Sequence, residues 1–356
     1  MDTSGMGAVA RSIHPEPVPG TRGPLAVGLD IGGTTTVAVL IDSQAKLVES
    51  VTLPTRPGSG GVVDGAVKAI ERLCAAGQLS KSCISRIGVG VPGIVDTRKG
   101  TICHAVNLRI GESPLHLADM LVRRFGVAAA IDNDLNVAAL GAAQTMAQAM
   151  GQDMAVQGVP AGHVQSGTTQ REDLAFLALG TGIAAGLYLD GKIHRGQGSA
   201  GEIGHIPWDP HGPLCPCGQY GCLELYASGS ALTAAWPNSG GTPAPVAIYQ
   251  AAAAGNAEAI AVKARHARAV AAAVRLLALS VDPRHIVLGG GVSQLGQPLL
   301  DAVTAALDDY CGHSTFLTSL QLSSRLQLAP RDIPVAAIGA AVLAQDTPQV
   351  VGACAR

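Results

Sequence analysis

Charged residues are scarce in this chain, and neither sign dominates. Of 356 residues only 14% are charged, and 24 Lys and Arg stand against 26 Asp and Glu, for a formal net charge of -2. Proteins that bind nucleic acid or an anionic membrane surface carry a basic patch or stripe, which this balance does not provide. We therefore expect neither nucleic acid nor a membrane as a partner.

A long hydrophobic run is also lacking. The longest uncharged, largely apolar stretch, residues 174–189, is shorter than the roughly 20 residues that a membrane-spanning helix needs, and Gly180, Gly182 and Gly186 interrupt it. The first residues are rich in proline and contain no apolar core segment, which excludes a signal peptide or anchor among them. We expect a disordered leader over residues 1–23 and a cytoplasmic location.

The chain has eight cysteines, but their spacing is not that of a disulfide framework. Scattered thiols are typical of a reduced cytoplasmic protein. The scattered cysteines are Cys74, Cys83, Cys103, Cys311 and Cys354. The other three fall in one short segment and have a different explanation.

Residues 201–224 combine metal-binding side chains with carboxylates. One histidine and three cysteines supply the four donors of a closed, tetrahedral zinc site, and a Cys-x-Cys-Gly turn lets two thiolates converge on one ion. The four residues are His205, Cys215, Cys217 and Cys222. A closed site leaves no position for substrate, so the zinc ion would be structural. The alternative is that these cysteines are incidental buried thiols.

Two glutamates are tied to the same segment. Glu202 comes three residues before His205, and Glu224 comes two residues after Cys222. Side chains next to a metal scaffold are held in place to hydrogen-bond a polar ligand. We expect both carboxylates to do so; the alternative is that they are solvated surface charges.

Three glycine-rich turns follow three predicted strands, at residues 27–30, 174–179 and 286–288. Glycines let backbone amides approach phosphate oxygens, and hydroxyls donate further hydrogen bonds. The first two turns are predicted to hold nucleotide phosphates, and the third to leave room for adenosine. The predicted nucleotide-binding residues are Asp30, Gly32, Gly33, Thr34, Thr35, Gly180, Thr181, Gly182, Gly289, Gly290 and Gly291.

The first turn also offers a ligand for magnesium, and the glycine motifs of the chain indicate which nucleotide-binding folds are disfavoured. Asp30 offers carboxylate oxygen to Mg2+, directly or through water. The chain has no Gly-x-x-x-x-Gly-Lys-Ser/Thr motif and no Gly-x-Gly-x-x-Gly after its first strand. P-loop and Rossmann folds are therefore disfavoured.

The order of the predicted elements contains an internal repeat. A strand, a glycine turn and a second strand occur over residues 25–41 and again over residues 174–189. Residues 146–171, rich in Gln, Gly, Ser and Met, lack clear periodicity and are predicted to form an inserted loop. The other predicted elements are helices 61–79, 113–125, 257–280 and 335–344 and strands 87–91, 127–131 and 286–288.

Several motifs together resemble those of the ROK family of sugar kinases and repressors. They are Asp30-Ile-Gly-Gly-Thr34, Gly180-Thr-Gly182, Gly201-Glu-Ile-Gly-His205 and Cys215-x-Cys-Gly-x-x-Gly-Cys222-x-Glu224. The resemblance implies an α/β chain of the actin-like, RNase H-like ATPase fold, with ATP and a sugar meeting in a central cleft. Its small domain would comprise residues 24–128 and 330–346, and its large domain residues 129–329. A homodimer, or a dimer of dimers, is also implied.

In that family the aspartate of an Asn-Asp pair is the catalytic base, which corresponds here to Asp134. A sugar hydroxyl has a pKa far above 7, so a carboxylate that accepts its proton assists phosphoryl transfer. Helix N-capping by Asp134 and an ordinary turn role for Asn107 are the structural alternatives. The resemblance assigns sugar binding to Asn107, Asn133, Asp134, Glu202, His205 and Glu224.

The chain departs from the family pattern at three places. Thr35 stands where a lysine usually follows Gly-Gly-Thr, which removes a positive charge near the phosphates. Ile110 stands where an aromatic residue is common, and the insertion precedes the second phosphate turn. None of these changes affects the expected base or the metal ligands.

These observations favour a kinase that uses ATP and Mg2+ to phosphorylate the 6-hydroxyl of glucose, the choice of glucose being an analogy. The alternatives are a kinase for N-acetylglucosamine, N-acetylmannosamine or fructose, and a sugar-sensing regulator without catalysis, which Thr35 keeps open. A DNA-binding repressor is disfavoured, because the 29 residues before Asp30 are too few for a winged helix-turn-helix.

Overall fold

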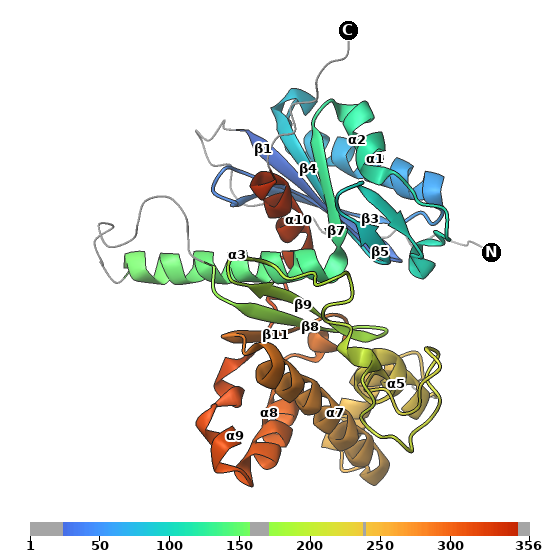
Figure 1. Ribbon diagram of the computed structural model, residues 1–356, viewed down its shortest axis with the longest axis vertical. Coiled ribbons are helices and arrows are strands. Elements are labelled where there is room, and N and C mark those ends of the chain that lie inside the picture. The colour runs from blue at the N-terminus through green and yellow to red at the C-terminus, as the bar shows by residue number, and fades with distance from the viewer. Residues whose placement is uncertain (1–23, 157–170, 238–239, 348–356) are drawn as a thin grey trace, which may run out of the picture. The chain divides into compact units, whose positions relative to one another are not determined.

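The computed structural model describes residues 24–156, 171–237 and 240–347 (Figure 1). The chain divides into two compact units, Met1–Val137 with Ala336–Arg356, and Ala138–Val335. Each unit has its own five-stranded sheet and its own hydrophobic core. The predicted leader over residues 1–23 lies outside the described residues. Within the described part of the chain, no helix is both long and apolar enough to cross a membrane.

The first unit has the strand order β3-β2-β1-β4-β7. An antiparallel meander is formed by β1 (Leu25–Ile31), β2 (Thr35–Ile41) and β3 (Leu47–Pro54). Two parallel strands, β4 (Ile84–Val91) and β7 (Ala128–Asn133), follow β1 across the sheet. The sequence places residues from 129 onward in the second domain, whereas pairing with β4 puts β7 in the first unit. The edge strand β3 was missed because half of its residues are only partly buried and its pattern shows no clean alternation.

Helices cover both faces of this first sheet. The inner face of β1, including Val27 and Leu29, shares a core with α1 (Ser59–Ala76) and α2 (Leu117–Phe125). Side chains alternate along a strand, so Gly28 and Gly88, which are paired, lie on the opposite face. A Cβ at either glycine would overlap a backbone carbonyl of α10 (Val335–Asp346), the helix that lies against β1 and β4 in Figure 1. The paired glycines therefore let α10 pack with its backbone against the sheet. The small strands β5 (Ile94–Asp96) and β6 (Thr101–Cys103) form a separate ribbon.

The second unit repeats the topology of the first, with the order β10-β9-β8-β11-β12. Its antiparallel part contains β8 (Leu174–Leu179), β9 (Ile183–Leu189) and β10 (Lys192–Ile193). Its parallel part adds β11 (His285–Gly289) and β12 (Leu326–Leu328). The internal duplication predicted from the sequence is thus confirmed.

Apart from α3 (Asp134–Val156), most of which lies in the second unit, the helices of the second unit come after β10. The longest, α7, begins after Asn256, whose side chain accepts a hydrogen bond from the Ala259 N–H and so caps the helix. The helices are α4 (Glu224–Ala227), α5 (Gly229–Ala235), α6 (Ala244–Ala253), α7 (Ala257–Val281), α8 (Gln297–Gly312) and α9 (Thr315–Ser319).

The prediction of a loop over residues 146–171 is wrong for residues 146–156. Helix α3 (Asp134–Val156) continues through residues 146–156. Its residues there are largely Ala, Gln and Met, which favour helix even where no amphipathic pattern is present. Residues 157–170 lie outside the described part of the chain.

Candidate functional site

The end of β1 and the start of α3 bring two carboxylates together in the first unit. Asp30 is paired with Gly90, and Gly90 with Asp132, so these positions share one face of the sheet. A Cβ at Gly90 would overlap the side chain of Val137, so the glycine makes room for the first turn of α3. Burial, together with the nearby carboxylate of Asp134, raises the pKa of Asp30 to about 7.

The Asn-Asp pair begins α3. Asn133 Oδ1 accepts a hydrogen bond from the Leu135 N–H at 2.9 Å, and Asp134 Oδ1 accepts one from the same N–H at 3.0 Å. The Asn133 N–H and the Asn136 side chain both donate to the buried Asp132 carboxylate at 2.8 Å. Asp134 therefore shares the capping of α3 with Asn133, and its partly exposed side chain is compatible with a second role.

The predicted first phosphate turn is an exposed hairpin tip. The Gly32 N–H donates to the Thr35 carbonyl at 2.9 Å, and Gly33, Thr34 and Thr35 are exposed. A Cβ at Gly33 would lie 2.9 Å from Asn107 Cβ, so glycine allows the turn to contact Asn107. Asn107 is itself exposed, on a single 3-10 turn. A predicted phosphate turn and a predicted sugar contact are thus adjacent in the first unit.

The predicted second phosphate turn, between β8 and β9, contacts Glu224. The Gly180 N–H donates to the Gly182 carbonyl at 3.0 Å and closes the turn. Glu224 Oε2 accepts a hydrogen bond from the Ile183 N–H at 3.2 Å, and a Cβ at Gly182 would overlap this oxygen. A sugar-binding candidate and a phosphate turn therefore share one support in the second unit.

Strand pairing places the third glycine turn beside the second. β11 runs parallel to β8, with Gly289 opposite Ala178. Gly290 has a φ of 83°, and a Cβ there would lie 2.7 Å from the Leu179 carbonyl carbon. The Gly229 N–H donates to the Gly180 carbonyl at 2.7 Å, a contact that was not predicted from the sequence. The only sequence signal for this contact was the serine before Gly229, a residue type that commonly caps a helix.

Two glycines fix Glu202 and His205 beside β9. A Cβ at Gly201 or Gly204 would overlap a β9 carbonyl, that of Ala185 or Ile183. Glu202 is exposed and starts a 3-10 turn that ends at His205. The same short part of β9 therefore positions Glu202, His205 and Glu224.

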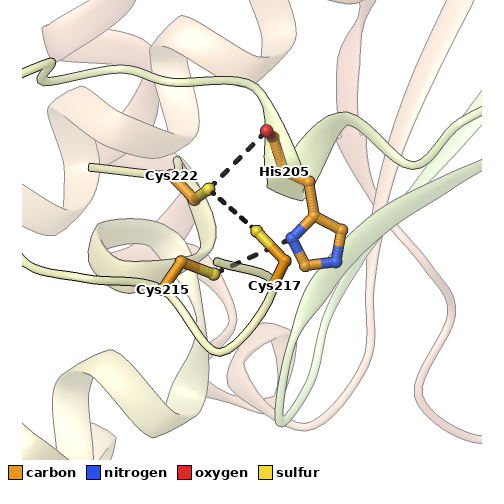
Figure 2. A group of neighbouring side chains, drawn as sticks. All are labelled: His205, Cys215, Cys217 and Cys222. Carbon is orange, nitrogen blue, oxygen red and sulfur yellow. Dashed lines mark hydrogen bonds between the residues drawn. The ribbon is translucent and has the colours of Figure 1, made fainter. Parts of the chain in front are cut away.

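The four predicted metal ligands converge (Figure 2). Their donor atoms lie within 4.8 Å of one another, with 3.9 Å between Cys215 Sγ and His205 Nδ1 and 3.6 Å between Cys217 Sγ and Cys222 Sγ. Donors on a tetrahedral zinc ion are about 3.4–3.8 Å apart, given Zn–S near 2.3 Å and Zn–N near 2.0 Å. The donor set and its spacing therefore fit one metal ion. In Figure 2 the His205 ring turns Nδ1 toward the cysteines and its other nitrogen away from them.

Gln219 supports this cluster and was not singled out from the sequence. Its side chain donates to the His205 carbonyl at 3.0 Å and to Cys217 Sγ at 3.5 Å. Hydrogen bonds from the Gln219 backbone and side chain lower the pKa of Cys217 to about 6, whereas burial raises the pKa of Cys222 to about 12. Metal binding would favour the thiolate at both positions.

The predicted site residues thus form two groups, one in each unit. The first unit holds Asp30, the Gly32–Thr35 turn, Asn107, Asn133 and Asp134. The second unit holds Gly180–Gly182, Glu202, the metal cluster with His205, Glu224 and Gly289–Gly291.

Comparison with known sequences gives a consistent result. The profile of the ROK family matches residues 26–162 and 155–347. A glucokinase of Halalkalibacterium halodurans is 31% identical over 303 residues, which cover 80% of this chain and 85% of that protein. An N-acetylmannosamine kinase of Salmonella arizonae is 27% identical over 282 residues, covering 79% and 87%.

Solved structures match over nearly the whole chain. A ROK hexokinase from Thermus thermophilus has a TM-score of 0.69 at 28% identity, covering 90% of this chain and 98% of that one. A ROK family glucokinase from Streptomyces griseus, in complex with glucose and AMPPNP, has a TM-score of 0.67 at 28% identity, covering 91% and 100%. The actin-like, RNase H-like fold predicted from the sequence is confirmed.

Proposed function

The chain belongs to the ROK family, and from this we propose that it is an ATP-dependent hexose kinase of the glucokinase type. It transfers the γ-phosphoryl group of ATP to the 6-hydroxyl of glucose. The observation that carries the proposal is the carboxylate pair of Asp30 and Asp134, where β1 ends and α3 begins, in a chain so similar to a glucokinase.

Asp134 is the general base. It accepts the proton of the sugar hydroxyl as the new O–P bond forms, and Asn133 beside it binds the sugar. Asp30 fits a role in holding Mg2+, because a hard cation would offset the burial and the Asp134 repulsion that together raise its pKa. When bound, Mg2+ neutralises negative charge on the phosphates.

The glycine turns bind the nucleotide. Backbone amides of the Gly32–Thr35 turn and of Gly180–Gly182 hold phosphate oxygens, apart from the Gly32 and Gly180 N–H groups, which close the turns. Gly289–Gly291, beside the second turn, leaves space for the adenosine.

The sugar hydroxyls are bound by carboxylates and amides. The proposed sugar ligands are Glu202, His205, Glu224, Asn107 and Asn133. A structural Zn2+ held by His205 Nδ1 and the three cysteines would fix the His205 tautomer, leaving its other nitrogen for the sugar.

A coupled assay of ADP release tests the proposal. It uses ATP, Mg2+ and a panel of hexoses and N-acetylhexosamines, with Asp134→Asn as the control. Turnover of one sugar that is lost in the control supports the kinase and names its substrate. Sugar binding by calorimetry without turnover would contradict catalysis, favour a sensor and point to Thr35 as the cause.

The second candidate is an N-acetylhexosamine kinase, favoured by the similarity to an N-acetylmannosamine kinase. The same panel separates the two, because only an N-acetylhexosamine kinase would turn over N-acetylmannosamine or N-acetylglucosamine faster than glucose. Fructose in the panel covers the remaining substrate alternative.

We also propose that the kinase is a cytoplasmic homodimer, or a dimer of dimers, as its family resemblance implies. Light scattering on the purified chain measures its mass in solution, and a monomer at assay concentrations would contradict this assembly.

A further inference from the structure

His266 is a buried histidine to which the proposed mechanism assigns no role. It lies on α7, its exposure is 1%, and its Nε2 lies 3.1 Å from the Ala227 carbonyl oxygen. A carbonyl only accepts, so Nε2 carries the proton and donates it. Nδ1 has no hydrogen-bond partner in the described part of the chain. The ring is therefore held by one hydrogen bond, as the neutral tautomer protonated at Nε2.

The carbonyl that His266 contacts is the last one of α4. The chain turns from α4 into α5 at Ser228, and no backbone N–H of the described residues donates to the Ala227 carbonyl. Ala227 is fully buried, so water cannot take the place of a backbone donor. A buried helix-end carbonyl without a partner is costly, and His266 supplies the missing donor from another helix.

The α4–α5 corner, residues 224–229, connects two functional groups. At its start, Glu224 accepts a hydrogen bond from the Ile183 N–H at 3.2 Å. At its end, the Gly229 N–H donates to the Gly180 carbonyl at 2.7 Å. The corner thus contacts the β8–β9 hairpin on both sides of its glycine turn. A shift of the corner would move the Glu224 carboxylate and the turn together.

We propose that His266 is a positioning residue for the kinase: through its hydrogen bond to Ala227 it holds the α4–α5 corner, and thereby aligns Glu224 for the sugar and Gly180–Gly182 for the nucleotide phosphates. The inference rests on the proposed function, because that function assigns Glu224 and the turn to these ligands. Its distinctive consequence is that one buried side chain affects the binding of both substrates.

Two substitutions separate the hydrogen bond from the volume of the ring. His266→Leu fills the space and removes the donor, whereas His266→Gln places an amide N–H near the position of Nε2. We expect His266→Leu to raise the KM for hexose and for ATP together, each on the order of tenfold, since a shift of about 1 Å remote from the chemistry can cost up to 100-fold. His266→Gln is expected to restore both KM values to within about twofold, the small remainder reflecting imperfect geometry.

A control variant distinguishes positioning from a general loss of stability. Val274 is also fully buried on α7 and does not contact the corner through any hydrogen bond, so Val274→Ala destabilises the same helix by a cavity. We expect Val274→Ala to lower the melting temperature about as much as His266→Leu does, but to leave both KM values unchanged. Equal KM increases in both variants, or no rescue by His266→Gln, would overturn the proposal. If His266→Leu does not fold, His266→Asn, whose amide is too short to reach Ala227, replaces it.

Hydrogen exchange without ligands gives a readout that does not depend on kinase activity. We expect His266→Leu, but not Val274→Ala, to speed exchange at the Ile183 and Gly229 amides. The Ile183 N–H donates to the corner, and the Gly229 N–H donates from the corner to the hairpin. Unchanged exchange in His266→Leu would overturn the positioning role even if the wild type is an active kinase. Faster exchange in His266→Leu, combined with a wild type that does not turn over hexose, would instead contradict only the proposed function.

Discussion

Asp30 and Asp134 are two carboxylates that repel one another when no cation lies between them. Burial, together with this repulsion, raises the folded-state pKa of Asp30 from 3.8 to about 7, so the native state binds more protons than the unfolded state between these values. The contribution of Asp30 to stability is therefore complete below pH 3.8 and is lost as the pH rises through 7. In Mg2+-free buffer we expect Asp30→Asn to have a higher melting temperature than the wild type at pH 8 but not at pH 4. Thermal unfolding at the two pH values measures this difference. An equal shift at both pH values would contradict this electrostatic origin.

Asp134 is predicted to act on turnover rather than on binding. Asp134→Asn keeps a hydrogen-bonding side chain of the same size but cannot accept the sugar proton. We expect turnover to fall on the order of 100-fold or more while hexose binding stays within a few-fold. Steady-state kinetics with calorimetry measure the two effects, and near-wild-type turnover would remove Asp134 from the role of base.

His266 also predicts a dependence of stability on acid. Burial lowers the pKa of its side chain to about 4, against a smaller opposing effect of the Ala227 carbonyl. The unfolded state, with a pKa near 6.5, binds the proton first, so the contribution is complete above pH 6.5 and is lost as the pH falls toward 4, by about 3 kcal/mol in all. His266→Gln removes this term. Urea unfolding at pH 7 and pH 5 should show a smaller acid loss in the variant; identical losses would contradict the prediction.

Much of the site was predictable at the residue scale because its motifs are local in sequence. The side chains of His205, Cys215, Cys217 and Cys222 converge as predicted, since short sequence spacing brings the three cysteines together. Gln219 and Gly229 were missed because Gln and Gly have many roles, and only the folded turn shows which group they contact. His266 could not be predicted at all: its partner, Ala227, is a backbone carbonyl of another helix.

At the scale of elements, the metal loop is predicted to support sugar binding. Replacing Cys217 with Ser removes one of four ligands, so zinc is released and Glu202, His205 and Glu224 lose their common support. We expect metal content to fall and hexose affinity to weaken, as metal analysis and calorimetry can determine. Cys103→Ser, at an isolated cysteine of the first unit, serves as the control. Stoichiometric zinc in Cys217→Ser would show that the ligand assignment is wrong.

Elements were predicted well where one short pattern decides them. The hairpins β1–β2 and β8–β9 have apolar strands and glycine tips, and both were located closely. Helix α3 was cut short because its second half has the composition of a helix but no apolar stripe. β7 was assigned to the wrong side of a boundary because strand pairing depends on contacts between β4 and a segment far along the chain.

At the scale of the whole molecule, two separate cores predict separate responses to metal removal. The cluster belongs to the second unit, and its neighbours share no core residue with the first sheet. After chelation we expect faster hydrogen exchange across residues 201–226 and unchanged protection in β1 and β4. Loss of protection in β1 and β4 as well would show that the two cores unfold together.

Helix α10 imposes an order on synthesis. The first sheet is made first, yet the helix that covers Gly28 and Gly88 comes after the entire second unit, Ala138–Val335. On the ribosome the second unit can therefore complete its core while the first sheet still exposes a glycine-lined face. A chain released before α10 emerges would keep that face uncovered, so premature termination late in translation should yield an incompletely folded, aggregation-prone product.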